Sequence, residues 1–234
     1  MMEWCGAMAV KIEPAKKNRK TVRNSVKKTA IIKAAAKVFG RNGFYETPLS
    51  DIAREARVSE STIYEYFSTK EELLFSIPAE TIRDYLNKNL EILQYIQGAA
   101  NKLRTLIYRH LSLYGDNEDY ANVVMLILKG NRNFLKTEDY KVVQASARVT
   151  TRVLEEGIRN GEFRSDLQPN LIRAMIWGTV EHLVTRKSLL GKPDDLMALA
   201  DDITNTVLHG IMVPEEKPRL YVHVRVDKKT VKEA

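Results

Sequence analysis

The sequence predicts an all-α protein of about nine helices, with a small three-helix domain near the N-terminus and a larger helical domain after it. From Ser25 onward, apolar residues recur almost throughout at positions three and four apart, which share one face of a helix. Glycines that can end helices, such as Gly43, Gly161 and Gly191, separate these segments. The candidate core contains no convincing strand pattern.

The first predicted helix begins near Ser25 and carries Ile31, Ala35, Val38 and Phe39 on one face. Asn42-Gly43 is expected to end it, because glycine tolerates the left-handed conformation that follows many helices. Residues 1–24 have no apolar periodicity and are rich in Lys and Arg. They are predicted to form a disordered basic arm.

Three amphipathic stripes and two strongly apolar segments follow residue 78. Val123–Leu128 is apolar on every face, which predicts a helix buried all round. Leu171–Leu190 is largely apolar and should end at Gly191, and Pro193 suits the first turn of the last helix. Pro78 is expected to break or kink the helix that starts near Leu73. The stripes are Leu103, Leu106, Ile107, His110, Leu111 and Tyr114; then Tyr140, Val143, Ala147, Thr150, Leu154 and Ile158; then Leu196, Leu199, Ala200, Ile203, Val207 and Ile211.

The net charge of +7 is unevenly distributed. Residues 1–78 carry 14 Lys and Arg against 9 Asp and Glu, whereas residues 79–213 balance at 17 against 17. The tail 214–234 is charged, with six basic and four acidic residues, and Leu220–Val226 in it alternates like an isolated strand. This asymmetry favours either a polyanion-binding N-terminal domain on a neutral body or a solvated tail without a partner.

Several classes of protein are disfavoured. No apolar run approaches the ~18 residues of a membrane span, and no secretory signal precedes the basic residues. Cys5 is the single cysteine, so a cytoplasmic location without disulfides is expected. The four histidines show no metal-ligand spacing, and Glu181-His182 face different ways on a helix. No nucleophile elbow, P-loop or Rossmann glycine pattern is present, so the sequence predicts neither an enzyme nor a bound cofactor.

Residues 47–70 carry the strongest local signal, a helix-turn-helix. Thr47 is expected to cap a helix whose first residue is Pro48, and residues 49–56 give it one apolar face. Residues 56–59 form the turn, and Ser59 can cap a second helix over 60–67. That helix would be roughly 12 Å long, which suits the major groove of DNA.

Lys70 is the most informative single residue of this segment. Ser68 and Glu71 fit a capping box, which places Lys70 in the first turn of the next helix. A cation there is opposed by the helix dipole. The presence of a lysine at this position is explained if a DNA phosphate docks at this helix N-terminus.

The stretch Thr29–Leu74 resembles the DNA-binding domain of the TetR family of transcription regulators. The matching segments are AIIKAAAKVFGRNGFYET, LSDIAREARVS and STIYEYFSTKEEL, and the pattern of Tyr64, Tyr66, Phe67, Lys70 and Leu73 is especially specific. The helical remainder matches the family in layout. The predicted boundaries are 1–24 for the arm, 25–73 for the DNA-binding domain, 74–213 for a ligand-binding and dimerisation domain, and 214–234 for the charged tail.

The resemblance also implies roles for individual residues. Glu60, Ser61, Thr62 and Tyr64 would face bases or nearby backbone. The residues expected mainly at phosphates or at the helix entry are Thr47, Ser50, Tyr66 and Lys70. For Tyr64 and Tyr66, core packing is the alternative. Two features depart from the family pattern: Arg57 stands where a glycine is usual, and Glu60 and Glu65 place acids near the DNA.

The last two helices are the candidates for a homodimer, in which they would form a four-helix bundle with their copies. The middle helices would enclose a pocket for a small hydrophobic effector. The C-terminal half resembles members that bind fatty acyl-CoA, so acyl-CoA is one candidate among the drug and lipid effectors of the family. Release from a palindromic DNA operator is the expected response. A DNA-binding protein without a ligand is the alternative. Candidate lining residues, each of which could instead be plain core, are Tyr108, Tyr114, Met125, Phe134, Met175 and His182.

Overall fold

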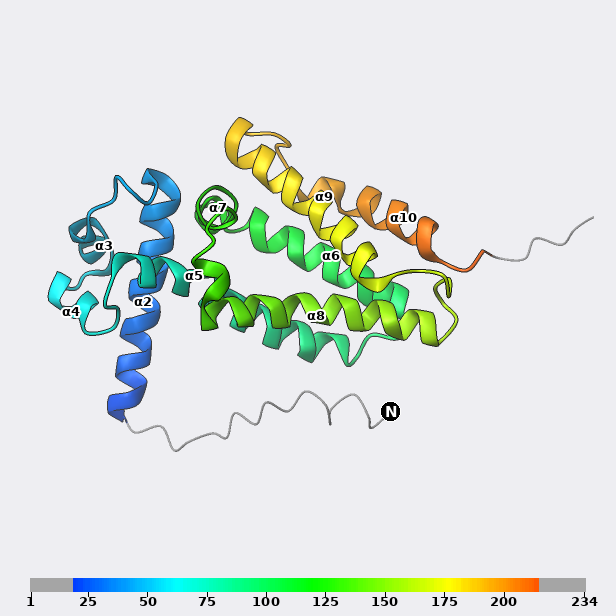
Figure 1. The fold of residues 1–234 in the computed structure, drawn as a ribbon, viewed down its shortest axis with the longest axis horizontal. Helices are drawn as coiled ribbons and strands as arrows, with labels where there is room; N and C mark the ends of the chain where they lie inside the picture. Colours follow the sequence, from blue (N-terminus) through cyan, green and yellow to red (C-terminus); the bar gives the residue numbers. More distant parts are fainter. Residues whose placement is uncertain (1–18, 215–234) are drawn as a thin grey trace, which may run out of the picture.

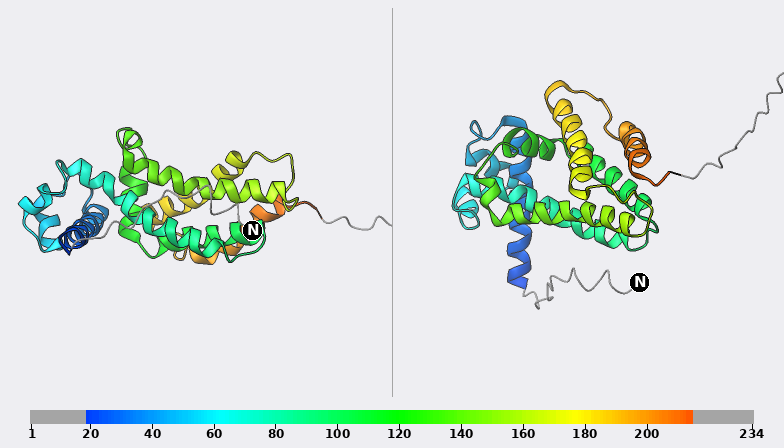
Figure 2. Two further views of the ribbon diagram at one scale, coloured as in Figure 1. Left: turned by 90° about the horizontal axis from the view of Figure 1, so that it is seen from below. Right: turned by 45° about the vertical axis from the view of Figure 1, so that its right-hand side comes forward.

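The computed structural model describes residues 19–214, with side chains from residue 24. Nine α-helices, α2–α10, form that part of the chain, and its only β contact is an isolated bridge between Phe163 and Met212. Helices α2–α4 form a head at one end of an elongated molecule, and the other helices form its body (Figures 1 and 2). The predicted all-α fold is confirmed.

The head consists of α2 (Arg19–Asn42), α3 (Leu49–Ala56) and α4 (Glu60–Tyr64). The apolar face predicted for the first helix is buried, and Ile31, Ala35 and Phe39 are fully covered. The helix ends at Asn42, before Gly43 with its φ of 83°, as predicted. It starts at Arg19 rather than Ser25, and the Arg and Lys residues of this segment are good helix formers. The rest of the predicted basic arm lies outside the described residues.

Helix α5 (Lys70–Leu93) runs from the head into the body. The break predicted at Pro78 is wrong, because the helix continues through it. A proline inside a helix costs about 3 kcal/mol, chiefly through the missing N–H bond and a clash with the preceding turn. Here every residue of Leu73–Ala79 is buried, so packing on several sides offsets that cost.

Helix α6 (Ala99–Gly115) carries its predicted stripe into the core of the body. It is followed by α7 (Glu118–Asn122), by η1, a π-helical turn over Val123–Leu128, and by the short 3-10 turn η2 (Phe134–Lys136). The prediction that Val123–Leu128 is buried all round is wrong at Leu126, which is 45% exposed. Leu126 lies in the π-helical turn, in which Val123, Met125 and Leu128 are buried.

Helix α8 (Glu138–Arg159) packs against α5 and α6 and ends at Asn160, before Gly161 with a φ of 74°. The predicted stop at Asn160-Gly161 is confirmed. Near that end the Phe163 ring lies so close to Gly157 that a β-carbon there would be 2.2 Å from it. Only glycine permits this contact between α8 and the returning chain.

Helix α9 (Pro169–Leu190) ends at Gly191, which adopts the left-handed conformation as predicted. A 3-10 turn, η3 (Met197–Leu199), then leads into α10 (Ala200–Ile211). The placement of Pro193 in the first turn of the last helix is wrong, because Pro193 lies in the connection and α10 begins at Ala200. Apart from Pro214, the charged tail with its alternating segment lies outside the described residues.

Candidate DNA-binding surface and sensor core

The turn and second helix of the helix-turn-helix form largely as predicted. Arg57 adopts the left-handed conformation (φ 55°), and the Val58 N–H donates to the Ala53 carbonyl 3.0 Å away. The Ser59 hydroxyl caps α4 by accepting from the Thr62 N–H at 3.2 Å. Buried Ile63 fixes the inner face of α4. The expected Ser59 cap is confirmed, and Arg57 takes the left-handed conformation that usually favours the glycine of the family pattern.

The outer face of α4 is free to meet a partner. Tyr64 is 56% exposed, and Glu60, Ser61 and Glu65 are exposed beside it. Regular α-helix ends at Tyr64 rather than Phe67, although N–H bonds to the Ile63 carbonyl continue the turn. The head thus presents a short helix with small hydroxyl side chains and one tyrosine outward.

The cap predicted at Thr47 is wrong. The Thr47 side chain is 1% exposed, and its hydroxyl donates to the Gly43 carbonyl at 2.7 Å. Pro48 is the residue that precedes α3, and no side chain caps it. The hydroxyl closes the loop between α2 and α3 instead, so it is turned away from the surface.

Lys70 is the first residue of α5, but the capping residues differ from the prediction by one position. Thr69, not Ser68, caps the helix by accepting from the Glu72 N–H at 3.0 Å, and the Glu72 carboxylate accepts from the Ser68 N–H at 2.7 Å. The sequence offers two adjacent hydroxyl residues followed by two adjacent glutamates, so both registers fit the same motif.

The Lys70 ammonium lies 4.6 Å from the centre of the Phe44 ring and 3.5 Å from the Tyr45 carbonyl. This cation–π contact compensates in part for the unfavourable helix dipole. Tyr45 itself is 87% exposed, and sequence reasoning did not single it out. Its position could have suggested a DNA contact, because Tyr45 is an aromatic residue that closely follows the predicted helix stop at Asn42-Gly43 in a basic domain.

The remaining candidate DNA contacts divide by exposure. Ser50 is exposed on α3. Thr62 and Tyr66 are partly buried, and Tyr66 packs against the core of the head. The surface of the head therefore combines α4, the start of α3 and the start of α5.

The six residues predicted to line a pocket do not lie together. Tyr114, Met125 and Phe134 are buried in the body. Tyr108 is half-buried and its hydroxyl donates to Asp201 on α10, which raises the Tyr108 pKa. Met175 is 60% exposed and His182 is also exposed, so both lie on the outer face of α9, and their assignment to the pocket stays a prediction. Helix α9 is apolar on both faces, and Ile176, Val180 and Val184 form the inner one.

A cluster of aromatic rings occupies the middle of the body, where α5, α6, α7 and α9 meet. The His110 ring centre lies 4.2 Å from that of Trp177, 5.1 Å from Tyr114 and 5.9 Å from Tyr85. Tyr114 also stacks on Tyr120 at 5.8 Å. Burial lowers the pKa of the His110 imidazole to about 4 and raises that of Tyr85 to about 12. Both groups are neutral near pH 7.

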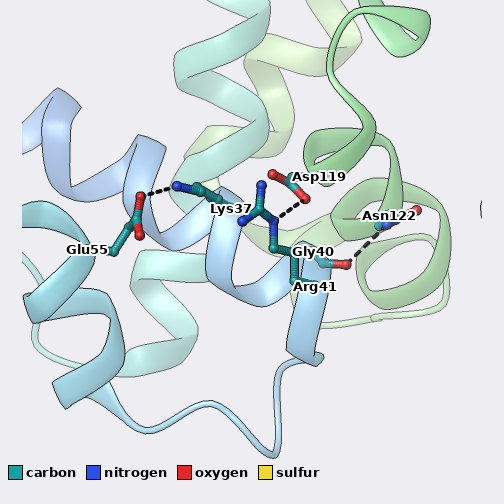
Figure 3. A network of polar contacts seen from close by, with 6 residues as sticks. All are labelled: Lys37, Gly40, Arg41, Glu55, Asp119 and Asn122. Atoms are coloured by element: carbon teal, nitrogen blue, oxygen red, sulfur yellow. Dashed lines mark hydrogen bonds and ion pairs between the residues drawn. The ribbon is translucent and has the colours of Figure 1, made fainter.

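The head and body touch closely through α2 and α7 (Figure 3). The Arg41 guanidinium pairs with the Asp119 carboxylate at 3.2 Å, and the Asn122 amide donates to the Gly40 carbonyl at 3.1 Å. A β-carbon on Gly40 would be 2.3 Å from the Asp119 carbonyl oxygen, so the two backbones are in contact. A displacement of α7 would therefore also displace α2.

An open groove of about 1250 Å³ lies beside this contact, between α2, α5, α6 and α7. Lysines and arginines line it together with an equal number of acidic residues, so it has no clear preference for an anion. Within residues 19–214, no cluster of His, Cys, Asp and Glu suits a metal ion. No helix of that range is long and apolar enough to cross a membrane.

Comparisons with known proteins cover both halves of the chain. The family described as bacterial regulatory proteins, tetR family, matches residues 31–77, and the YsiA-like protein C-terminal region matches residues 79–210. The chain is 31% identical over 181 residues to the fatty acid metabolism regulator protein of Bacillus subtilis (strain 168), which covers 77% of this chain and 93% of that protein.

Two solved structures are similar over most of their length. The regulator FadR of Bacillus subtilis in complex with stearoyl-CoA superposes with a TM-score of 0.73 at 30% identity, over 78% of this chain and 98% of that one. The fatty acid degradation regulator FadR of Bacillus halodurans also superposes with a TM-score of 0.73. Its identity is 29%, and the match covers 79% of this chain and 95% of that one. Both a DNA-binding half and a sensor half are thus matched.

Proposed function

The chain belongs to the TetR family of bacterial regulatory proteins, and from this premise we propose that it is a homodimeric repressor released from a palindromic operator by a fatty acyl-CoA. The observation that carries the effector is the similarity to a fatty acid metabolism regulator over nearly the whole length of that protein. A related regulator is known with stearoyl-CoA bound. Acting on chromosomal DNA, the protein would work in the cytoplasm, and we expect no catalytic activity.

We assign the DNA contacts by exposure. Ser61 and Tyr64 on the outer face of α4 are placed to reach base edges, with Glu60 and Thr62 beside them. Ser50, Tyr45, Tyr66 and Lys70 surround this face and suit phosphates. The Thr47 hydroxyl is enclosed in the head, so its role would be to shape the entry of α3.

Homodimerisation is expected through α9 and α10, because one short recognition helix gives too little contact for a specific site. Large apolar side chains remain exposed on α9, although its inner face is already buried. Leu171 and Met175 are exposed one turn apart near the start of α9, and Leu189 and Leu190 are exposed at its end. A second copy would cover them.

The effector would enter the body beside Tyr114 and Met125, which are buried next to α7 and within η1, whereas Phe134 is buried against Phe75 and Tyr140. Because the backbone of α7 touches that of α2 at Gly40, a ligand that displaces α7 would reorient the head. The second α4 of the dimer would then no longer match its half-site.

Native mass spectrometry of the protein titrated with stearoyl-CoA tests the effector and the dimer together. We expect a dimer that takes up one stearoyl-CoA per subunit and does not take up free CoA. A dimer that binds no stearoyl-CoA at micromolar concentration would refute the effector class. It would favour a DNA-binding protein without this ligand.

Lys70→Ala is expected to weaken binding to specific and non-specific DNA alike, by about three- to tenfold, because a phosphate contact carries no sequence information. The slope of log K against log salt should become less steep by about 0.9. Fluorescence anisotropy over a salt series measures both.

Arg159→Ala is the matched control, since it removes an exposed cation from the last turn of α8, and that end of α8 lies at the end of the body opposite the head (Figure 1). If the Lys70→Ala protein preferred different bases from the wild type and kept the wild-type salt slope, the phosphate assignment would be contradicted.

A further inference from the structure

The imidazole of His110 is an unusual feature of the aromatic cluster. It lies on the buried stripe of α6 with three aromatic rings around it, from α5, α6 and α9. Within residues 24–214, no hydrogen bond or ion pair joins its ring nitrogens to another side chain or to the backbone. Buried polar groups of proteins almost always have such a partner.

The side chain also keeps some accessible surface in spite of its central position. The ring is therefore not sealed by its neighbours. Burial lowers the pKa of the imidazole to about 4, so at pH 7 it is neutral and offers one N–H donor and one lone pair. It can bind a neutral group that reaches the cluster.

The surroundings favour a neutral acceptor over an anion. The nearby cation, Arg109, is engaged with Asn89 on α5 and packs against the Tyr85 ring at 5.9 Å. On the other side, burial raises the pKa of Tyr114, and the charge of Glu181, which pairs with Lys129 at 2.8 Å, adds to the shift. A carboxylate placed beside His110 would lose its hydration, which costs far more for an anion than for a neutral carbonyl oxygen.

The rings supply the apolar part of such a site. Trp177, Tyr114 and Tyr85 pack around the His110 ring, and an alkyl chain that entered beside it would contact these rings. A ligand that combines one neutral carbonyl with a long alkyl chain meets both requirements, and a fatty acyl thioester is such a ligand. A free fatty acid, ionised at pH 7, is not.

We propose that His110 donates a hydrogen bond to the thioester carbonyl of the bound fatty acyl-CoA, with Tyr85, Tyr114 and Trp177 around the adjoining carbons. This inference rests on the proposed effector and adds the residue that distinguishes a thioester from a free acid. It also connects the ligand to the head. Tyr114 stacks on Tyr120, which is next to Asp119, the partner of Arg41 on α2.

The test compares stearoyl-CoA with its thioether analogue S-octadecyl-CoA, which has the same chain and nucleotide but no carbonyl. Isothermal titration calorimetry at pH 7 gives both dissociation constants. The wild-type protein should bind the thioether about tenfold more weakly, because the analogue leaves a buried donor unpaired. His110→Phe should bind both ligands with the same, weaker affinity.

Thr105→Val is the matched control, because Thr105 is on the same helix but its hydroxyl donates to the Asn101 carbonyl. It should keep the wild-type preference for the thioester. A second measurement needs only the wild-type protein and stearoyl-CoA labelled with carbon-13 at the carbonyl. The infrared carbonyl band of the bound ligand should lie at a lower frequency than that of an equally labelled simple thioester in a hydrocarbon solvent.

An equal preference for the thioester in wild type and His110→Phe, or a bound carbonyl band at its hydrocarbon position, would overturn the role of His110 and leave acyl-CoA as effector. A wild-type protein that binds neither CoA derivative would overturn the role of His110 together with the proposed effector. The two failures are therefore distinguishable.

Discussion

Lys102→Met is expected to lower the free energy of unfolding by about 3–5 kcal/mol, the usual cost of leaving one member of a buried ion pair without the other. The Lys102 ammonium on α6 lies 2.6 Å from the Glu156 carboxylate on α8. Both side chains are nearly buried, at 11% and 12% exposure. The second carboxylate oxygen of Glu156 is buried and has no hydrogen-bond partner in the described part of the chain. Removing the lysine leaves this charge uncompensated.

Urea unfolding followed by circular dichroism measures the effect. The double variant with Glu156→Leu should recover most of the loss, because two apolar side chains of similar volume can replace a buried pair at little cost. Lys141→Met, which breaks the exposed pair with Glu138, should change stability by less than about 0.5 kcal/mol. A Lys102→Met variant as stable as Lys141→Met would show that the interior pair contributes no more than a surface one.

Gly40→Ala is expected to destabilise the protein by about 1–3 kcal/mol, the range of overpacking, and to reduce the response to the effector. The new β-carbon would lie 2.3 Å from the Asp119 carbonyl oxygen and 2.7 Å from its α-carbon. These are backbone atoms, so α7 must move away from α2. The Arg41–Asp119 pair and the bond from Asn122 to the Gly40 carbonyl depend on the same contact (Figure 3).

The measurement is operator affinity with and without stearoyl-CoA, together with urea unfolding. Gly115→Ala is the control, because nothing lies within 4 Å of a β-carbon at that position. If Gly40→Ala kept the wild-type ratio of affinities while losing stability, the α2–α7 contact would hold the fold together without transmitting the signal.

The head was the part of the fold most open to prediction from sequence, because its signals are local. Ser59 caps α4 as expected, since it is the one hydroxyl residue in the right place. Thr47 was misplaced because its hydroxyl reaches the Gly43 carbonyl across a loop. The cap of α5 was misplaced by one residue, because Ser68–Thr69 and Glu71–Glu72 allow two registers.

The body was less predictable, because tertiary packing decides which face of an apolar helix is inside. Met175 and His182 are on the outer face of α9, and no spacing within that helix distinguishes its two apolar faces. Pro78 continues α5 only because Leu73–Ala79 is buried on all sides. His110 was correctly placed on the α6 stripe, but its lack of a polar partner depends on residues from two other helices, α5 and α9.

The most direct test of the central proposal is operator release by an acyl-CoA. A DNA duplex that the protein selects from a random library serves as the operator, and fluorescence anisotropy measures its affinity at fixed salt. We predict that stearoyl-CoA lowers this affinity at least about tenfold, within the usual range of allosteric coupling, and that free CoA does not. An operator affinity unchanged by saturating stearoyl-CoA would contradict the account.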